Sequence, residues 1–203
     1  MALVLDIEKI ILTLVLIWCI LICFEATGIH AQPGYPPKEE INALRDIAKE
    51  LRKTDWNFTH NPCDNSTYWV TPKRSEMPLY NNTVYCNCNY NGGECHVTDI
   101  ILKGQDLAGV LPPSLVKLPY LRNIDLFRNY LSGTIHPEWA STKLEYLSVG
   151  GNRLSGPIPK YLGNITTLIY MSLESNMFNG TVPAELGKLF NLVNLSGFLI
   201  FKF

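Results

Sequence analysis

One periodicity constrains this chain more than any other feature of its sequence. Apolar residues recur at intervals of 24, 23 and 24 residues, at Leu102, Leu126, Val149 and Leu173. A side-chain amide follows three positions later each time: Gln105, Asn129, Asn152 and Asn176. The same register holds Leu107, Leu131, Leu154 and Phe178, and then the glycines Gly109, Gly133, Gly156 and Gly180. Such a period predicts a stack of similar units in which each covers the apolar face of its neighbour.

The residues inside one period predict how each unit folds. Segment 144–149 alternates like a strand, with Leu147 and Val149 pointing inward and Tyr146 and Ser148 pointing outward. The amide that follows turns the chain and can bond backbone groups that would otherwise be buried without a partner. A Gly-x-Ile-Pro step after the amide then breaks any helix and returns the chain in an extended path.

At these residues the sequence resembles a known family. Leu-x-x-Leu-x-Leu-x-x-Asn-x-Leu-x-Gly-x-Ile-Pro-x-x-Leu-Gly is similar to the plant-type leucine-rich repeat, and 144–165 and 168–189 match it almost throughout. The phrases DWNFTHNPC, CNCNYNGGECHVTDIILKGQDLAGVLP and NIDLFRNYLSGTIHPEWA resemble the ectodomain start of plant leucine-rich-repeat receptor-like serine/threonine kinases of subgroup VIII. The resemblance covers roughly residues 38–195. It implies an α/β-type repeat solenoid of about four to five repeats with a helical, disulfide-containing N-terminal cap.

In that family, further repeats, a malectin-like domain, a membrane helix and a cytoplasmic kinase would follow. We therefore interpret the chain as an ectodomain truncated before these regions. We divide it into a signal peptide at 1–31, a cap with a loop insertion at 32–96, repeats at 97–195 and a divergent C-terminal tail at 196–203.

The apolar run at 10–24 supports the signal peptide, because fifteen residues are short for a membrane span and right for a signal-peptide core. Cleavage would give a secreted protein or one at the extracellular face of the plasma membrane. Contact with the membrane is expected only through the missing C-terminal part or through an uncleaved signal anchor, which is the alternative interpretation.

The cap is predicted to contain one amphipathic helix and two disulfides. Ile41, Leu44, Ile47 and Leu51 fall on one helical face, which can cover the open end of the first repeat. Removal of the signal peptide leaves four cysteines: Cys63, Cys86, Cys88 and Cys95. An even number in a secreted chain predicts disulfides, although the spacing also leaves a four-thiolate zinc site open.

Among the cysteine pairings, we do not expect Cys86 to bond Cys88. Of the pairings left, Cys63–Cys86 with Cys88–Cys95 is preferred, because it closes a tight hairpin around residues 91–93. The chain also carries six Asn-x-Ser/Thr sequons, which predict N-linked glycans in a secreted protein. Their asparagines are Asn57, Asn65, Asn81, Asn164, Asn179 and Asn194.

Nothing in the sequence predicts catalysis. The four histidines are scattered, and we find no kinase signature, paired metal ligands or phosphate-binding glycine loop. We therefore expect no catalytic residue, cofactor or metal. The net charge of −1, without a basic or acidic tract, gives no indication of a nucleic-acid partner.

The remaining candidate site is the surface formed by outward-facing residues of successive strands. Phe127, Tyr146 and Tyr170 are predicted to lie side by side on a concave face, with Ile101 extending them into a diagonal aromatic strip. The alternative is that these are ordinary exposed apolar residues without a binding role. The predicted ligand-binding face consists of Ile101, Lys103, Asp125, Phe127, Tyr146, Ser148, Tyr170, Ser172 and Glu174.

These features predict an extracellular recognition module. Its partner would be an extracellular protein, a peptide, a cell-wall glycan or a co-receptor. A second hypothesis is a secreted inhibitor of a cell-wall hydrolase, since polygalacturonase-inhibiting proteins resemble this repeat too. Inhibition of a hydrolase in an activity assay separates the two.

Overall fold

The computed structural model describes residues 13–15, 34–64, 66–70, 82–90 and 93–196. The chain divides into two compact units, 1–31 and 32–203. In the first unit the described residues, Thr13–Val15, are helical, and the rest of the predicted signal peptide lies outside the described residues. Most of the predicted loop insertion and the tail from residue 197 also lie outside them. No helix within the described part of the chain is long and apolar enough to cross a membrane.

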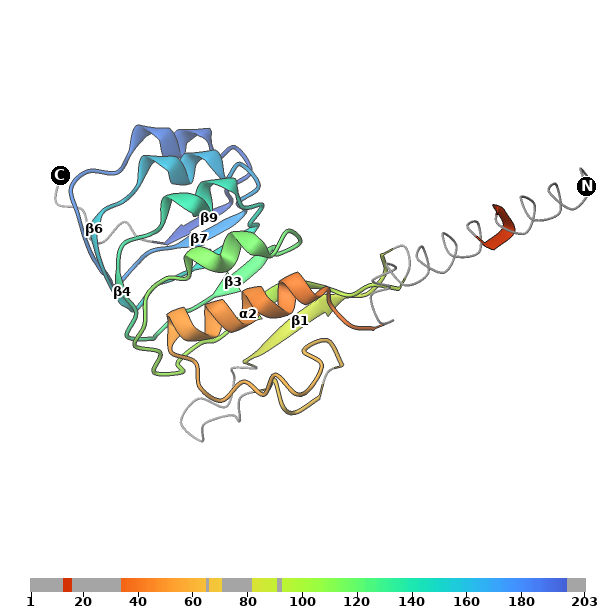
Figure 1. Ribbon diagram of the computed structural model, residues 1–203. Coiled ribbons are helices and arrows are strands. Elements are labelled where there is room, and N and C mark those ends of the chain that lie inside the picture. Colours follow the sequence, from red (N-terminus) through yellow and green to blue (C-terminus); the bar gives the residue numbers. More distant parts are fainter. Residues whose placement is uncertain (1–12, 16–33, 65, 71–81, 91–92, 197–203) are drawn as a thin grey trace, which may run out of the picture. The chain divides into compact units, whose positions relative to one another are not determined.

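The second unit begins with the cap helix α2, Lys38–Leu51. Glu39 and Glu40 lie in its first turn, where they complement the helix dipole, and its buried face includes Leu44 and Ile47. Figure 1 shows α2 beside the first repeat, as the sequence predicts.

The end of α2 lies directly against Gly109. The Val110 N–H donates to the Glu50 carbonyl oxygen at 3.0 Å. A Cβ atom built on Gly109 would lie 2.6 Å from the carbonyl carbon of Leu51, a separation that real Cβ atoms do not show. The first repeat therefore needs glycine at position 109, so that the cap helix can approach the backbone of this repeat.

Six strands form the larger sheet. Their order is β1 (Thr83–Asn87), β2 (His96–Ile101), β3 (Asn123–Asp125), β5 (Tyr146–Ser148), β7 (Tyr170–Ser172) and β9 (Asn194–Ser196). β1 pairs antiparallel with β2, and every later neighbour is parallel. The inward residue of each repeat strand is buried in one continuous core, as shown by Ile100, Ile124, Leu147 and Met171.

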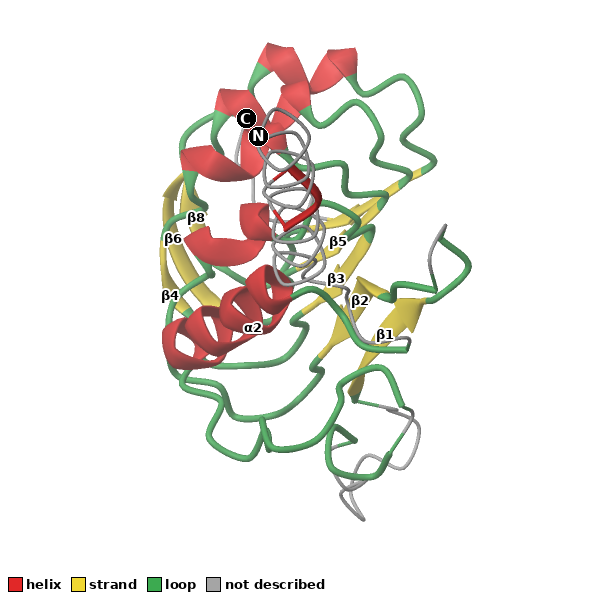
Figure 2. Ribbon diagram, turned by 45° about the vertical axis from the view of Figure 1, so that its right-hand side comes forward, coloured by secondary structure: helices red, strands yellow, loops and turns green. Residues whose placement is uncertain are grey.

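A second sheet forms on the opposite side of the unit (Figure 2). It contains the parallel strands β4 (Ser132–Gly133), β6 (Arg153–Pro157) and β8 (Met177–Asn179). Each extended return path then leads, at its proline or at His136, into a 3-10 helix. These helices are η1 (Pro113–Lys117), η2 (Pro137–Ser141), η3 (Lys160–Asn164) and η4 (Ala184–Lys188). The sequence predicted the extended path but neither its pairing into a sheet nor the 3-10 helices.

The repeat asparagines form a ladder between units. The Asn152 side-chain amide donates to the carbonyl oxygens of Leu126 and Val149, both at 2.9 Å. Its Oδ1 atom accepts the N–H of Leu131 at 3.0 Å. Asn152 thus bonds its own strand to the strand and turn of the preceding unit, and Asn129 and Asn176 make equivalent bonds.

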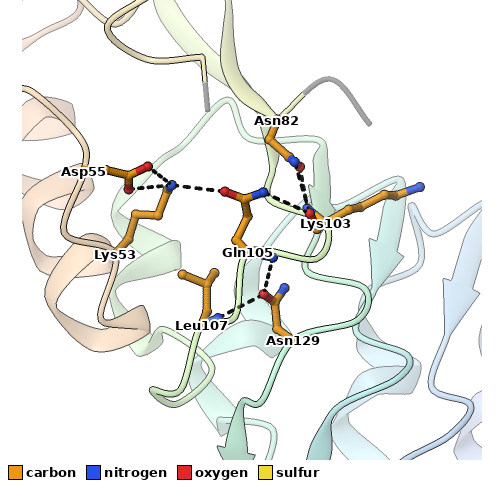
Figure 3. A network of polar contacts seen from close by, with 7 residues as sticks. All are labelled: Lys53, Asp55, Asn82, Lys103, Gln105, Leu107 and Asn129. Carbon is orange, nitrogen blue, oxygen red and sulfur yellow. Dashed lines mark hydrogen bonds and ion pairs between the residues drawn. The ribbon is translucent and has the colours of Figure 1, made fainter. Parts of the chain in front are cut away.

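In the first repeat, Gln105 replaces the asparagine because the neighbour of this repeat is the cap (Figure 3). The Gln105 Nε2 atom donates to the carbonyl oxygen of Lys103 at 3.2 Å, and its Oε1 atom lies 3.4 Å from Lys53 Nζ. Lys53 also pairs with Asp55 at 2.6 Å, and burial lowers its pKa. Asn82 completes this network by bonding both backbone groups of Lys103. The longer glutamine side chain reaches a cap residue that asparagine would not reach.

A left-handed residue stands before each ladder amide. These residues are Gly104, Arg128, Gly151 and Ser175, with φ angles of 58°, 57°, 66° and 53°. Glycine adopts this conformation freely, whereas other L-residues are destabilised in it by ~1–2 kcal/mol. The turn therefore favours glycine in all four units, although only two have it.

We expect Ser175→Gly to raise the free energy of unfolding by up to ~1 kcal/mol, because the left-handed conformation of this exposed residue would no longer be strained. Urea denaturation of the disulfide-intact protein measures the change. The reverse substitution in the preceding unit, Gly151→Ser, should lower stability. A Ser175→Gly variant that is less stable than the original chain would contradict this explanation.

Candidate functional site

The parallel register aligns the outward-facing side chains of the larger sheet into three rows. The first row is Asp99, Asn123, Tyr146, Tyr170 and Asn194. The second row is Ile101, Asp125, Ser148, Ser172 and Ser196. Backbone hydrogen bonds that continue the pairing set a third row, Lys103, Phe127, Gly150 and Glu174. We call these three rows the strand face, and all nine predicted binding residues lie on it.

A pair of stacked tyrosines dominates the first row. The ring centroids of Tyr146 and Tyr170 are 4.3 Å apart and the ring planes differ by 5°. This separation is close to the ~4.8 Å spacing of neighbouring strands, so the rings stand side by side on β5 and β7. Both side chains are half-buried. The pair offers a rigid aromatic surface that spans two repeats.

Asp125 holds the tyrosine pair in place. This carboxylate is only 2% exposed, and its Oδ2 atom lies 2.9 Å from Lys103 Nζ and 3.3 Å from the Tyr146 hydroxyl. Its Oδ1 atom accepts the N–H of Phe127 at 3.1 Å. Burial, and then the negative charge of Asp125, raise the pKa of Tyr146. The Tyr146 hydroxyl therefore keeps its proton and can donate to the carboxylate.

The predicted single aromatic strip is wrong. Phe127 is in register with Gly150 in the third row, two outward positions along the strand from the row of Tyr146. The second-row residues Asp125 and Ser148 lie between them. A Cβ atom on Gly150 would lie 3.1 Å from two ring atoms of Phe127, so the ring packs over the glycine backbone. Phe127 is therefore partly a packing residue, and Ile101 lies beside Asp125 rather than beside an aromatic ring.

The serines of the second row also differ from the prediction. Ser148 and Ser172 are only 2% and 1% exposed, although their positions face outward. The Ser172 hydroxyl has no hydrogen-bond partner within the described part of the chain. These serines shape the strand face but offer little surface to a ligand.

Sequence reasoning missed a hollow along the edge of the strand face. It has a volume of about 450 Å³ and is lined by Glu145, Thr167, Ile169, Asn191 and Val193. We call it the rim hollow. Ile169 and Val193 are 46% and 76% exposed and directly precede first-row positions in consecutive units. Two apolar residues 24 positions apart were the signal that could have found it.

The cap holds its histidine and cysteines in structural contacts. His96 Nδ1 lies 2.6 Å from Glu40 Oε1, and the N–H of Val97 donates to the same carboxylate at 2.9 Å. Two disulfides join Cys63 to Cys86 and Cys88 to Cys95, the pairing that the sequence favoured. Among the residues that the structure describes, no three His, Cys, Asp or Glu side chains are grouped to hold a metal ion.

The four described sequon asparagines lie in different places. Asn57 is half-buried in the cap and accepts hydrogen bonds from Thr59. Asn164 is exposed in η3, and Asn179 is exposed in β8 of the smaller sheet. Asn194 is exposed in β9, next to Tyr170 in the first row of the strand face. Asn65 and Asn81 lie outside the described residues.

Comparison with known proteins gives consistent similarities. The family model described as Leucine Rich Repeat matches residues 143–165. A probable leucine-rich repeat receptor-like serine/threonine-protein kinase of Arabidopsis thaliana is 48% identical over 135 residues, which are 65% of this chain and 13% of that protein. A second such kinase from the same plant is 43% identical over 131 residues, 64% of this chain and again 13% of the relative. This chain therefore spans about an eighth of the length of these relatives.

The fold is also found among solved structures. The ectodomain of BIR2 from Arabidopsis thaliana superposes with a TM-score of 0.63 and 25% identity, and the match covers 80% of each chain. The repeat solenoid described above is thus also the fold of this plant ectodomain.

Proposed function

Because the chain is a leucine-rich-repeat solenoid related to plant receptor-like kinases, we propose that it is an extracellular recognition module. It binds a protein or peptide ligand, or a co-receptor, on its strand face, and it performs no catalysis itself. The tyrosine pair of Tyr146 and Tyr170, fixed by the buried carboxylate of Asp125, is the observation that carries this proposal.

The tyrosine pair has the properties of a binding hot spot. Tyrosine is enriched where interfaces concentrate their binding energy, since it combines a large apolar ring with a hydroxyl group. A side chain that is already fixed loses little conformational entropy when a partner binds. Tyr146 meets this condition through its stacking on Tyr170 and its contact with Asp125.

Groups beside the tyrosine pair can add specificity. The rim hollow offers apolar contact through Ile169 and Val193, and the third row offers charge through Lys103 and Glu174. A polypeptide lying across the strand face could place an apolar side chain in the hollow and polar groups along the third row. This combination of an aromatic centre and a polar margin is typical of protein-recognition surfaces.

We expect a Tyr146→Ala/Tyr170→Ala variant to lose its partner. Truncation of hot-spot residues costs ~2 kcal/mol or more each, so affinity should fall by ~30-fold or more. The partner is captured from plant cell-surface extract on the secreted original chain, identified, and then titrated against both proteins. The melting temperature of each protein shows whether the fold is retained.

Tyr130→Ala is the matched control for this experiment. Tyr130 is 46% exposed, and its ring lies under Arg153 of β6, in the smaller sheet, away from the strand face. It should leave affinity unchanged. Equal affinity of the double variant and the original chain at equal melting temperature would exclude the strand face as the site. Inhibition of a polygalacturonase by the original chain would instead favour the hydrolase-inhibitor hypothesis.

A further inference from the structure

We propose that Asn194 carries an N-linked glycan that stands beside Tyr170 and closes one side of the tyrosine pair. The sequon is Asn194-Leu195-Ser196, and its asparagine is exposed. The inference concerns the surface on which the proposed function rests, but its test requires no binding partner.

The register of β9 directs the Asn194 side chain onto the strand face. Asn194 is opposite Tyr170, and Leu195 is opposite the inward-facing Met171. The Asn194 N–H donates to the carbonyl oxygen of Ile169 at 3.2 Å, which fixes the backbone at this residue. Within the described ranges the Asn194 side chain makes no hydrogen bond that would have to be broken on modification.

Glycosylation of this residue is chemically simple. The Nδ2 atom of Asn194 loses one proton and forms a bond to the anomeric carbon of the first N-acetylglucosamine. The lipid diphosphate of the oligosaccharide donor leaves in the same step. The secretory pathway supplies this donor to sequons of nascent chains, so access during synthesis does not depend on the folded strand.

The glycan can extend only where the neighbouring side chains leave room. Strands in a sheet lie ~4.8 Å apart and Asn194 is opposite Tyr170, so the first sugar on Asn194 is within reach of the Tyr170 ring. The apolar face of the sugar can cover the edge of the tyrosine pair. A partner must then approach from the β2–β5 side.

The two other exposed sequon asparagines among the described residues cannot have this effect. Asn164 lies in a 3-10 helix and Asn179 lies in the smaller sheet on the opposite side of the unit. A glycan at either position extends away from Tyr170. Asn164 is therefore the matched control, because it is exposed like Asn194 and differs only in its place in the fold.

The test combines site mapping with labelling of Tyr170. The chain is secreted from plant cells, and glycopeptides are treated with a glycosidase that converts a glycosylated asparagine to aspartate, which mass spectrometry detects. Hydroxyl-radical footprinting then measures the labelling rate of Tyr170 in the original chain and in Asn194→Gln, Ser196→Ala and Asn164→Gln. Both variants that remove the Asn194 sequon should increase Tyr170 labelling several-fold at unchanged melting temperature, and Asn164→Gln should not.

An unoccupied Asn194 in the secreted protein would overturn the inference. So would an occupied Asn194 whose removal leaves the labelling of Tyr170 unchanged. Neither result bears on whether the tyrosine pair binds a partner, because the footprinting contains no partner. Conversely, loss of the proposed binding function would not change the occupancy of Asn194 or the protection of Tyr170 from labelling.

Discussion

An Asn152→Leu variant is expected to lose ~3 kcal/mol of unfolding free energy, a large part of the ~5–15 kcal/mol typical of a domain. Asn152 is 8% exposed, and its amide satisfies the carbonyl oxygens of Leu126 and Val149 and the N–H of Leu131. Leucine has a similar volume but no polar atom. The N–H of Leu131 would remain buried without a partner, at a cost of ~1–3 kcal/mol. The two carbonyl oxygens also accept from Asn129 and Asn176, so each would lose one of its two bonds, worth ~0.5–1.5 kcal/mol.

Thermal unfolding of the disulfide-intact protein measures this effect. A loss of this size should lower the melting temperature by roughly 10 °C in a domain of this length. Gln105→Leu is the matched control at the end of the ladder. Gln105 is half-buried, and its side chain bonds Lys103 and Lys53 at the edge of the cap instead of two neighbouring repeats. Gln105→Leu should lose clearly less free energy of unfolding than Asn152→Leu. An equal loss in the two variants would show that the asparagine ladder does not stabilise the interior repeats more than its end.

The sequence predicted the repeat fold because its signals are local and recur in phase. Each unit carries its own inward leucines, its amide and its glycine, so an ambiguous residue in one unit is corrected by the other three. The sequence showed that Gln105 stands where the other repeats have asparagine. It did not show the reason, because Lys53, which Gln105 contacts, lies 52 residues away in the cap. Contacts between the cap and the first repeat have no period to reveal them.

Glu40 illustrates the same limit. In sequence it is one of two acidic residues in the first turn of a helix, a position that the helix dipole explains. In the structure it is 2% exposed and bonds both His96 and the backbone of Val97. A carboxylate that joins the cap to the first strand cannot be distinguished in sequence from one that faces water.

The candidate site was predicted in its residues but not in its arrangement. Alternation along each strand was enough to identify which side chains face outward. Alternation alone did not fix which side chains are level across strands. The repeat period does, because Leu126 and Val149 are equivalent residues, and Phe127 therefore aligns with Gly150 and not with Tyr146. The buried Asp125 that fixes Tyr146 was on the predicted face, but only the register showed what it contacts.

Gly163→Ala should be about as destabilising as the loss of a ladder asparagine, although it adds only one methyl group. Gly163 lies in η3, and a Cβ atom there would lie 2.7 Å from the carbonyl carbon of Glu185 in η4 and closer still to its oxygen. The obstacle is backbone, which cannot rotate away as a side chain would. The two 3-10 helices would have to separate. Overpacking costs ~1–3 kcal/mol and occasionally more, and a fixed backbone obstacle at this distance places Gly163→Ala at the upper end of that range.

Gly187→Ala isolates the steric cause. Gly187 is the equivalent residue of the next unit, 24 positions later, and a Cβ atom there meets nothing within 4 Å among the described residues. The sequence treats the two glycines alike, because both follow a leucine in the same Leu-Gly step. Gly187→Ala should be neutral or stabilise the protein by ~0.4–1 kcal/mol, since alanine restricts the unfolded chain more than glycine does.

Chemical denaturation of Gly163→Ala and Gly187→Ala compares their free energies of unfolding. Equal changes would mean that the glycines serve the local 3-10 conformation, whereas a loss confined to Gly163→Ala would show that the close approach of neighbouring units requires this glycine.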